Sequence, residues 1–414
     1  MVIGILFRFC FALLVTASLC CGQRFYTYVG DVSAHSVTLA WGTTKGSGNT
    51  IGRDSRSHGE VTVKIGDREL SAAGRNWIEV TGLDAGREYP YEVLLDGRPI
   101  GRGAIRTHPS QASRLVFFVI GDYGNASSGQ RTLAAAMTRE FEKRWSTSDP
   151  PRFVLATGDI IYGRFFNLFS TGDKDSRWEA THFQPYEGIL RHVPFYATLG
   201  NHDGNSSESR GDLAVYLDNF FFPGGKPARY YDFSFGGLAD FFGLDTTTNT
   251  EVGPPRPNYG PESEQFAWLK GALAKSRVPW KIAYFHHPPF SAGPRHSASL
   301  SELEHIHQLL AASGVQAVFN GHEHNFQFAN RSERSGGIQY VVTGAGGELR
   351  NGRVSGETMR TADIAGWAPQ RHFLVVELDE REMRITPLGA EPIHVTGSDG
   401  NPVPMPIVVP KEQQ

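Results

Sequence analysis

The first third of the chain alternates short apolar and polar positions. Three runs carry this alternation clearly: Val37–Trp41, Val61–Ile65 and Tyr91–Leu95. Turn-forming stretches rich in Gly, Asn and Asp separate them, as at residues 45–52 and 96–97. Period-two alternation bounded by turns is typical of half-buried strands. We therefore expect an all-β sandwich of two sheets over residues 24–107 that contributes no metal ligand.

A different pattern follows a short linker, His108 to Gln111. Apolar runs now alternate with segments of helical periodicity, which predicts an α/β domain. Expected strands lie at residues 115–120, 153–156, 195–199, 239–244, 282–285, 317–319 and 338–342. Expected helices lie at residues 132–144, 262–276 and 300–313, and residues 373–387 read as a hairpin. Most of these strands are continuously apolar, which indicates cover on both faces.

The N-terminus reads as a targeting segment. Residues 1–19 are almost wholly apolar with one basic residue, Arg8, and small or polar residues follow at positions 20–22. We expect a signal peptide over residues 1–22, cleavage near Gly22 and a secreted protein, extracellular or periplasmic, without stable membrane insertion. The alternative is an uncleaved membrane anchor. All three cysteines, at positions 10, 20 and 21, lie in or beside this segment. The cleaved protein would then have no disulfide and no thiolate metal ligand.

Composition narrows the function classes. The chain has 414 residues, of which 40% are hydrophobic and 20% charged, with a formal net charge of -3. This balance fits a globular protein of two or three domains and favours neither nucleic acid nor an anionic membrane as a partner. The 15 histidines matter more, because histidine is the commonest metal ligand near neutral pH.

Five polar clusters follow directly after apolar strands. They are Gly121-Asp122-Tyr123-Gly124, Gly158-Asp159-Ile160-Ile161-Tyr162, Gly200-Asn201-His202-Asp203, His286-His287-Pro288-Pro289 and Gly321-His322-Glu323-His324. Loops at the carboxyl ends of strands meet in one crevice. The clusters together supply oxygen and imidazole donors suited to iron, zinc or manganese. A bridging carboxylate can hold two such cations, which clamp a phosphoryl group.

This series resembles the calcineurin-like metallophosphoesterases, and specifically the purple acid phosphatases, over residues 113–390. Generic members have a histidine where this chain has Gly124, and Tyr162 in a Gly-Asp-x-x-Tyr pattern replaces that ligand, as in the purple phosphatases. The resemblance implies two packed mixed sheets flanked by helices, with residues 391–414 as a tail. Ala283 departs from the valine that the family often shows before its fourth cluster, which affects strand packing rather than a ligand. Trp41 and the turn Leu83–Tyr89 likewise resemble a fibronectin type III-like domain.

The resemblance implies roles for single residues. A ferric ion would be held by Asp122, Asp159, Tyr162 and His324, and a divalent ion (zinc, iron or manganese) by Asp159, Asn201, His286 and His322. Asp159 would be the bridge. His202 matches the family's histidine that contacts phosphate or the leaving group, and Asp203 would orient it. His296, preceded by Arg295, falls where plant-type members place a substrate histidine, although an ordinary solvated pair is an equal alternative. His287 reads as a structural neighbour of the ligands.

The function implied is hydrolysis of small phosphate monoesters by a metal-bound hydroxide at mildly acidic pH. A phosphodiesterase acting on nucleotides or phospholipid head groups would use the same metal core and differ only in its loops. An adhesion or carbohydrate-binding protein built on the β-sandwich would have lost the metal ligands, and all seven are present. The natural substrate and the oligomeric state remain open at this point.

Overall fold

The structure is a computed structural model that describes residues 24–44, 50–162, 177–203, 213–226, 228–248, 259–350 and 352–411. The expected signal peptide lies outside these residues. In the described part of the chain, no helix combines the length and apolarity needed to cross a membrane.

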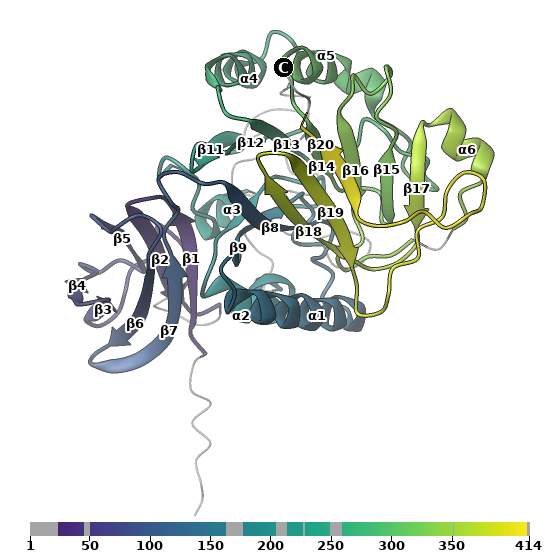
Figure 1. Ribbon diagram of the computed structural model, residues 1–414. Helices are drawn as coiled ribbons and strands as arrows, with labels where there is room; N and C mark the ends of the chain where they lie inside the picture. Colours follow the sequence, from purple (N-terminus) through teal and green to yellow (C-terminus); the bar gives the residue numbers. More distant parts are fainter. Residues whose placement is uncertain are drawn as a thin grey trace, which may run out of the picture.

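The N-terminal domain is a sandwich of two antiparallel sheets (Figure 1). One sheet has the order β1-β2-β5, with strands Tyr26–Val32, Ser36–Gly42 and Trp77–Thr81. The other has the order β4-β3-β6-β7, with strands Arg68–Ser71, Val61–Ile65, Glu88–Leu95 and Arg98–Arg106. Trp41 is fully buried between them. The backbone N–H of Asp84 donates to the Tyr89 hydroxyl at 2.8 Å, which closes the expected tyrosine-corner turn.

The second domain begins with a six-stranded mixed sheet of order β10-β9-β8-β18-β19-β20. Its strands are Phe195–Ala197, Pro151–Ala156, Arg114–Ile120, Phe373–Asp379, Glu382–Leu388 and Ile407–Pro410. Strands β8, β9 and β10 run parallel, and β18 to β20 continue the sheet in antiparallel fashion. Strand β20 lies in the stretch expected to be a tail, so the chain after residue 390 completes this sheet.

The other sheet has seven strands in the order β11-β12-β13-β14-β16-β15-β17. They span Tyr231–Phe235, Ala239–Gly243, Trp280–Tyr284, Ala317–Asn320, Gln339–Thr343, Phe326–Ala329 and Ile364–Ala368. The central strands β12, β13, β14 and β16 are parallel, and the outer ones are antiparallel. The domain therefore has the expected two mixed sheets.

The two sheets pack face to face through aromatic side chains. The ring of Phe117 on β8 lies 5.3 Å from that of Phe241 on β12 and 6.1 Å from that of Phe319 on β14. Helices cover the outer faces (Figure 1). Helices α1 (Ser128–Trp145) and α2 (Gln184–Leu190) pack on the six-stranded sheet, and α4 (Glu264–Lys275) and α5 (Leu300–Ala312) on the seven-stranded one. Shorter helical segments are Glu179–Phe183, α3 (Ala214–Asn219) and α6 (Gly356–Thr361).

The two domains share a packed interface. Tyr26 and Tyr28 on β1 belong to the same buried cluster as the six-stranded sheet. The Tyr196 hydroxyl on β10 donates to Oδ1 of Asp31 at 2.6 Å. In the linker, the buried His108 ring lies 4.8 Å from the Phe235 ring. The N-terminal domain therefore rests against strand β10, which leads directly into one of the polar clusters.

Candidate metal centre

All five polar clusters lie at carboxyl ends of parallel strands, and both sheets contribute. Strands β8, β9 and β10 of the six-stranded sheet lead to Asp122, Asp159 and Asn201. Strands β13 and β14 of the seven-stranded sheet lead to His286 and to the cluster that begins at Gly321. The docking of the two sheets thus creates one crevice at the edge where these strands end.

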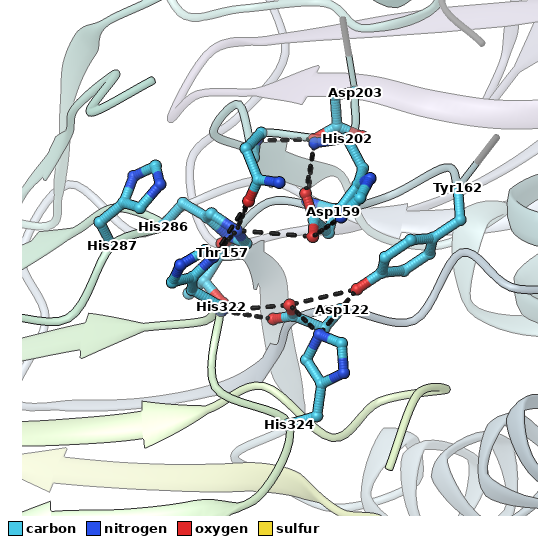
Figure 2. Close-up of polar contacts among 12 residues, drawn as sticks. Asp122, Thr157, Asp159, Tyr162, His202, Asp203, His286, His287, His322 and His324 are labelled. Carbon is cyan, nitrogen blue, oxygen red and sulfur yellow. Dashed lines mark hydrogen bonds and ion pairs between the residues drawn. The ribbon is translucent and has the colours of Figure 1, made fainter. Parts of the chain in front are cut away.

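Three donors converge on one side of the crevice (Figure 2). The Tyr162 hydroxyl lies 3.2 Å from Oδ1 of Asp122 and 3.2 Å from Nε2 of His324. Nε2 of His324 lies 3.3 Å from the same Asp122 oxygen. A phenol, a carboxylate and an imidazole therefore point at one another, and we call this group the Tyr162 corner.

Three further donors converge on the other side. Oδ1 of Asn201 lies 3.0 Å from Nε2 of His286 and 3.0 Å from Nδ1 of His322, and these two nitrogens are 3.2 Å apart. The other ring nitrogen of His286, Nδ1, lies 2.9 Å from the Thr157 carbonyl oxygen. That bond places a proton on Nδ1 and leaves Nε2 as the lone-pair atom that faces the crevice. We call this group the Asn201 corner.

Asp159 lies between the two corners. Its Oδ2 is 3.5 Å from Nε2 of His286, and the atom is buried without a hydrogen-bond partner. Its carboxylate also lies within 4.8 Å of ligand atoms of Asp122 and His324, a grouping able to hold a metal ion. A buried carboxylate oxygen with no partner is costly unless a cation neutralises it. The donor set therefore fits a pair of cations that share Asp159.

The pKa shifts of Asp122 and Asp159 also favour cations between their carboxyl groups. Burial, and then the charge of Asp159, raises the pKa of Asp122 well above its ordinary value. Burial also opposes ionisation of Asp159, but the imidazoles of His286 and His202 outweigh it and lower its pKa. The two carboxyl groups thus resist ionising together, as two like charges in a buried site do. Cations between them would remove that conflict.

The loops that carry these donors have unusual backbone conformations. Asp122, Asp159 and His322 have φ values of 55°, 53° and 71°, a region that side-chain-bearing residues seldom occupy. At Gly124 the reason for glycine is steric, because an added Cβ would lie 1.9 Å from the Ile160 carbonyl oxygen. The loops after β8 and β9 can therefore touch only if residue 124 has no side chain. A histidine would not fit at residue 124, and the loop after β9 supplies Tyr162 instead.

Asp203 holds two of these loops together. Its Oδ2 accepts hydrogen bonds from the N–H groups of Asp159 at 2.9 Å and Gly200 at 2.7 Å. Its Oδ1 accepts from the N–H groups of Ile160 at 2.7 Å and Ile161 at 3.1 Å. We expected this carboxylate to orient the His202 imidazole, which stays a prediction, and these four bonds give it a further task. Asp203 ties the loop after β9 to the loop after β10.

His202 lies beside Asp159 (Figure 2). Its backbone N–H donates to Oδ1 of Asp159 at 2.8 Å, and its Nε2 lies 4.0 Å from Oδ2 of that residue. Its ring centroid is 4.7 Å from the Tyr162 ring, and 22% of its side chain is exposed. His202 is thus positioned beside the bridging carboxylate while remaining in contact with solvent.

His296 lies beside the Asn201 corner and is partly exposed. Its ring centroid lies 3.9 Å from that of His322 and 6.3 Å from that of His324. His287 lies beside the Asn201 corner, with Nδ1 at 3.0 Å from the Thr246 hydroxyl oxygen and its ring 4.5 Å from the His322 ring.

Burial keeps these histidines neutral. It lowers the pKa of His324 to about 3, with Arg350 as the next cause, and that of His287 to about 3, with His286 as the next cause. It lowers the pKa of His322 as well, with His286 as the next cause. Neutral imidazole is the form that binds metals, so the site is ready for cations in mildly acidic solution.

Two charged residues near the site escaped the sequence analysis. Glu323 lies between two of the clustered histidines, is fully buried, and accepts a hydrogen bond from the His296 N–H at 2.5 Å. Its place inside a recognised cluster was a usable signal. Arg350 follows β16, and its N–H donates to the His324 carbonyl oxygen at 3.2 Å. No motif marks that arginine.

Comparison with known proteins agrees with this geometry. The model of the calcineurin-like phosphoesterase family matches residues 115–326. Tartrate-resistant acid phosphatase type 5 of Rattus norvegicus is 27% identical over 303 residues, which cover 66% of this chain and 86% of the rat protein. Purple acid phosphatase 15 of Arabidopsis thaliana is 26% identical over 309 residues, which cover 65% of this chain and 53% of the plant protein.

Solved structures show the same fold. A purple acid phosphatase from yellow lupin (Lupinus luteus) seeds superimposes with a TM-score of 0.68 at 17% identity, covering 94% of this chain and 74% of the lupin chain. The fold and the donor cluster define a metal-binding phosphoesterase. The chain belongs to the calcineurin-like phosphoesterase family, and its relatives include purple acid phosphatases.

Proposed function

We propose that this protein is a secreted acid phosphatase of the purple type, which hydrolyses small phosphate monoesters with one ferric and one divalent cation. The single observation that carries the proposal is the pair of donor corners that share Asp159, with a tyrosine in one of them. When bound, such cations lower the pKa of a bound water and neutralise charge on the phosphoryl oxygens. The relatives named above are acid phosphatases, which favours this reaction class.

The two corners differ in the charge that they offer. Burial, and then Asp122 and Asp159, raises the pKa of Tyr162 well above its ordinary value. Only a strongly charged cation in contact with the oxygen can hold that phenol as phenolate, so the Tyr162 corner suits a trivalent ion. The Asn201 corner offers neutral donors, the amide oxygen and two imidazoles, which suit zinc, iron(II) or manganese. Asp159 would bridge the two.

The remaining residues handle the substrate and the proton. Hydrolysis forms a bond from a water-derived oxygen to phosphorus and breaks the bond to the leaving oxygen, which must take up a proton. The solvent-accessible imidazole of His202 is the donor that we assign to that oxygen, since it lies beside the centre without occupying either corner. Asp203 positions the loops, and the His296 ring lies 3.9 Å from the His322 ring of the Asn201 corner.

The test compares hydrolysis of p-nitrophenyl phosphate, bis-p-nitrophenyl phosphate and a cyclic nucleotide, together with metal analysis of the purified full-length protein. We expect the monoester to be preferred, about two metal ions per chain, and loss of activity after chelation that returns with added metal. Asp159→Asn should lose both cations together, because it removes the shared ligand. Preference for either diester would instead establish the phosphodiesterase alternative, and a protein with no bound metal would refute both.

A further inference from the structure

A network of buried polar side chains forms hydrogen bonds with the loop that carries His296. Glu323 accepts from the His296 N–H at 2.5 Å, and Oε1 of Gln327 accepts from the Ala292 N–H at 2.8 Å. The side-chain amides of Asn325 and Gln327 both donate to the Gly293 carbonyl oxygen at 3.0 Å. Glu323, Asn325 and Gln327 are fully buried. A satisfied network of this kind fixes a loop in one conformation.

A second loop packs against the first. A Cβ on Gly352 would lie 2.4 Å from Cγ of Pro294, so the two loops are in direct contact. Arg295 is next to one of these residues, and Arg350 precedes the other by two positions. The N–H of Arg350 is also bonded to the carbonyl oxygen of His324 at 3.2 Å. The two arginines therefore lie on touching loops, and the backbone of one loop is bonded to a residue of the Tyr162 corner.

The positive charges of both arginines act on the site. Burial lowers the pKa of His296 to about 4, and the next causes are Arg350 and then Arg295. Arg350 is also the largest charge effect on His324. Glu323 is the acidic group that both arginines influence, and its oxygens already accept from the His296 N–H and the Asn325 amide. Nε of Arg350 is buried without a hydrogen-bond partner.

The guanidinium groups of Arg295 and Arg350 could still bind an anion. In the part of the chain that the structure describes, neither Arg295 nor Arg350 forms an ion pair with a carboxylate. A guanidinium offers several N–H donors in a planar fork that suits carboxylate and phosphate oxygens. The ring centroid of His296, the residue after Arg295, lies 3.9 Å from that of His322 in the Asn201 corner, and the two rings are tilted by 33°. The loops that carry the two arginines thus border the donor corners, on the side where the leaving group of a substrate held at the metals could extend.

We propose that Arg295 and Arg350 form a second anion subsite, supported by the Glu323 network, and that the preferred substrates are phosphate esters with another anionic group on the leaving-group side. This inference rests on the proposed phosphatase function and names its substrate class. Phosphate at the metals and a carboxylate or second phosphate at the arginines would bind together. Esters with neutral leaving groups would use the metal centre alone.

The experiment uses the metal-loaded full-length protein and a matched pair of substrates, phenyl phosphate and 3-carboxyphenyl phosphate. The variants are Arg295→Gln, Arg350→Gln and the double variant. Arg381→Gln is the control, because it removes the same charge from the exposed β18–β19 turn, where β18 pairs with the N-terminal end of β8, away from the site. Equilibrium binding of methylenediphosphonate and methylphosphonate by calorimetry gives a readout that does not depend on turnover.

We expect the double variant to raise KM for the carboxylated substrate by about 10- to 100-fold, the range of a lost charge-assisted hydrogen bond. Phenyl phosphate should change by less than about 3-fold, as should both substrates with Arg381→Gln. Binding of the diphosphonate should weaken with the KM effect, and that of the monophosphonate should not. Equal losses on both substrates would overturn the subsite and leave the phosphatase function intact. Failure of the wild type to hydrolyse phenyl phosphate would instead contradict the proposed function itself.

Discussion

The hydroxyl oxygen of Tyr162 lies 3.2 Å from Nε2 of His324, although 162 positions separate the two residues in the chain. The tyrosine follows a strand of the six-stranded sheet and the histidine follows a strand of the seven-stranded sheet. This contact therefore joins the two halves of the domain at the point where a cation would bind.

The first prediction concerns colour. A tyrosinate bound to ferric iron absorbs visible light by charge transfer from ligand to metal. The purified protein should be pink to purple, and Tyr162→Phe should bleach it while metal in the Asn201 corner remains. The measurements are the visible spectrum and metal content. Tyr216→Phe is the matched control, because Tyr216 is also a buried tyrosine but lies outside both corners. A colourless wild-type protein with a full complement of ferric iron would rule out Tyr162 as a ligand.

The second prediction concerns the proton donor. His202→Ala should reduce turnover by roughly 100- to 10,000-fold on glycerol 2-phosphate, whose leaving alkoxide needs a proton. The loss should be much smaller on p-nitrophenyl phosphate, whose leaving group is already stable as an anion. Both metals should stay bound, because His202 lies outside both corners. Equal losses on the two substrates would remove the general-acid role, and His296 would be the next residue to test.

The third prediction separates two roles for Asp203. If its carboxylate holds the loops through four backbone amides, Asp203→Asn should weaken metal binding by about 10- to 100-fold, as losses of supporting contacts around a metal site commonly do. The activity remaining at saturating metal should show no dependence on the leaving group. Metal titration followed by assays on the same two substrates measures both effects. A variant that keeps its metals and reproduces the leaving-group dependence of His202→Ala would restore the role of orienting His202.

The fourth prediction concerns stability in acid. Burial lowers the pKa of His108 and His182 to about 3 and that of His372 to about 4, each from an ordinary value of 6.5. Below pH 6.5 the unfolded chain takes up protons that the folded chain refuses. Stability therefore falls as the pH drops from about 6.5 toward 4, by up to about 1.4 kcal/mol per unit for each group.

Denaturant unfolding of the metal-free protein at several pH values measures this slope. His372→Gln should make the slope shallower, because it removes one of the buried groups whose protonation opposes folding. His394→Gln serves as the control, since His394 is exposed and should leave the slope unchanged. If His372→Gln and His394→Gln behave alike, the buried histidines are not the cause of acid sensitivity.

Sequence patterns predicted the central elements well, and for a physical reason. Strands such as β8 and β9 are covered on both faces, so they appear as continuous apolar runs that end at a Gly-Asp pair. Strand β11, with alternating exposure, was missed, as was the short strand β20. Both are edge strands of four or five residues, which is too short for a repeating pattern to stand out from loops.

Some residues of the candidate site could be predicted from local sequence patterns, and others could not. The metal-facing donors were predicted because each lies in a cluster directly after a strand. The bonds that Asp203 and Glu323 accept from backbone N–H groups were not, because any residue could supply such a partner. His305 and His307 lie on helix α5. They are half-buried, and their rings are bonded to the Tyr259 carbonyl oxygen and the Tyr340 hydroxyl. Contacts between distant segments of this kind leave no local pattern.

The order in which the donors occur along the chain has a consequence for biosynthesis. Asp122 accepts from the His322 N–H across 200 positions, and the Tyr162 corner is complete only when His324 is in place. A nascent chain that ends before strand β14 therefore holds two of the three donors of each corner. A complete donor set in either corner therefore exists only after nearly the whole domain has been synthesised and its two sheets have docked.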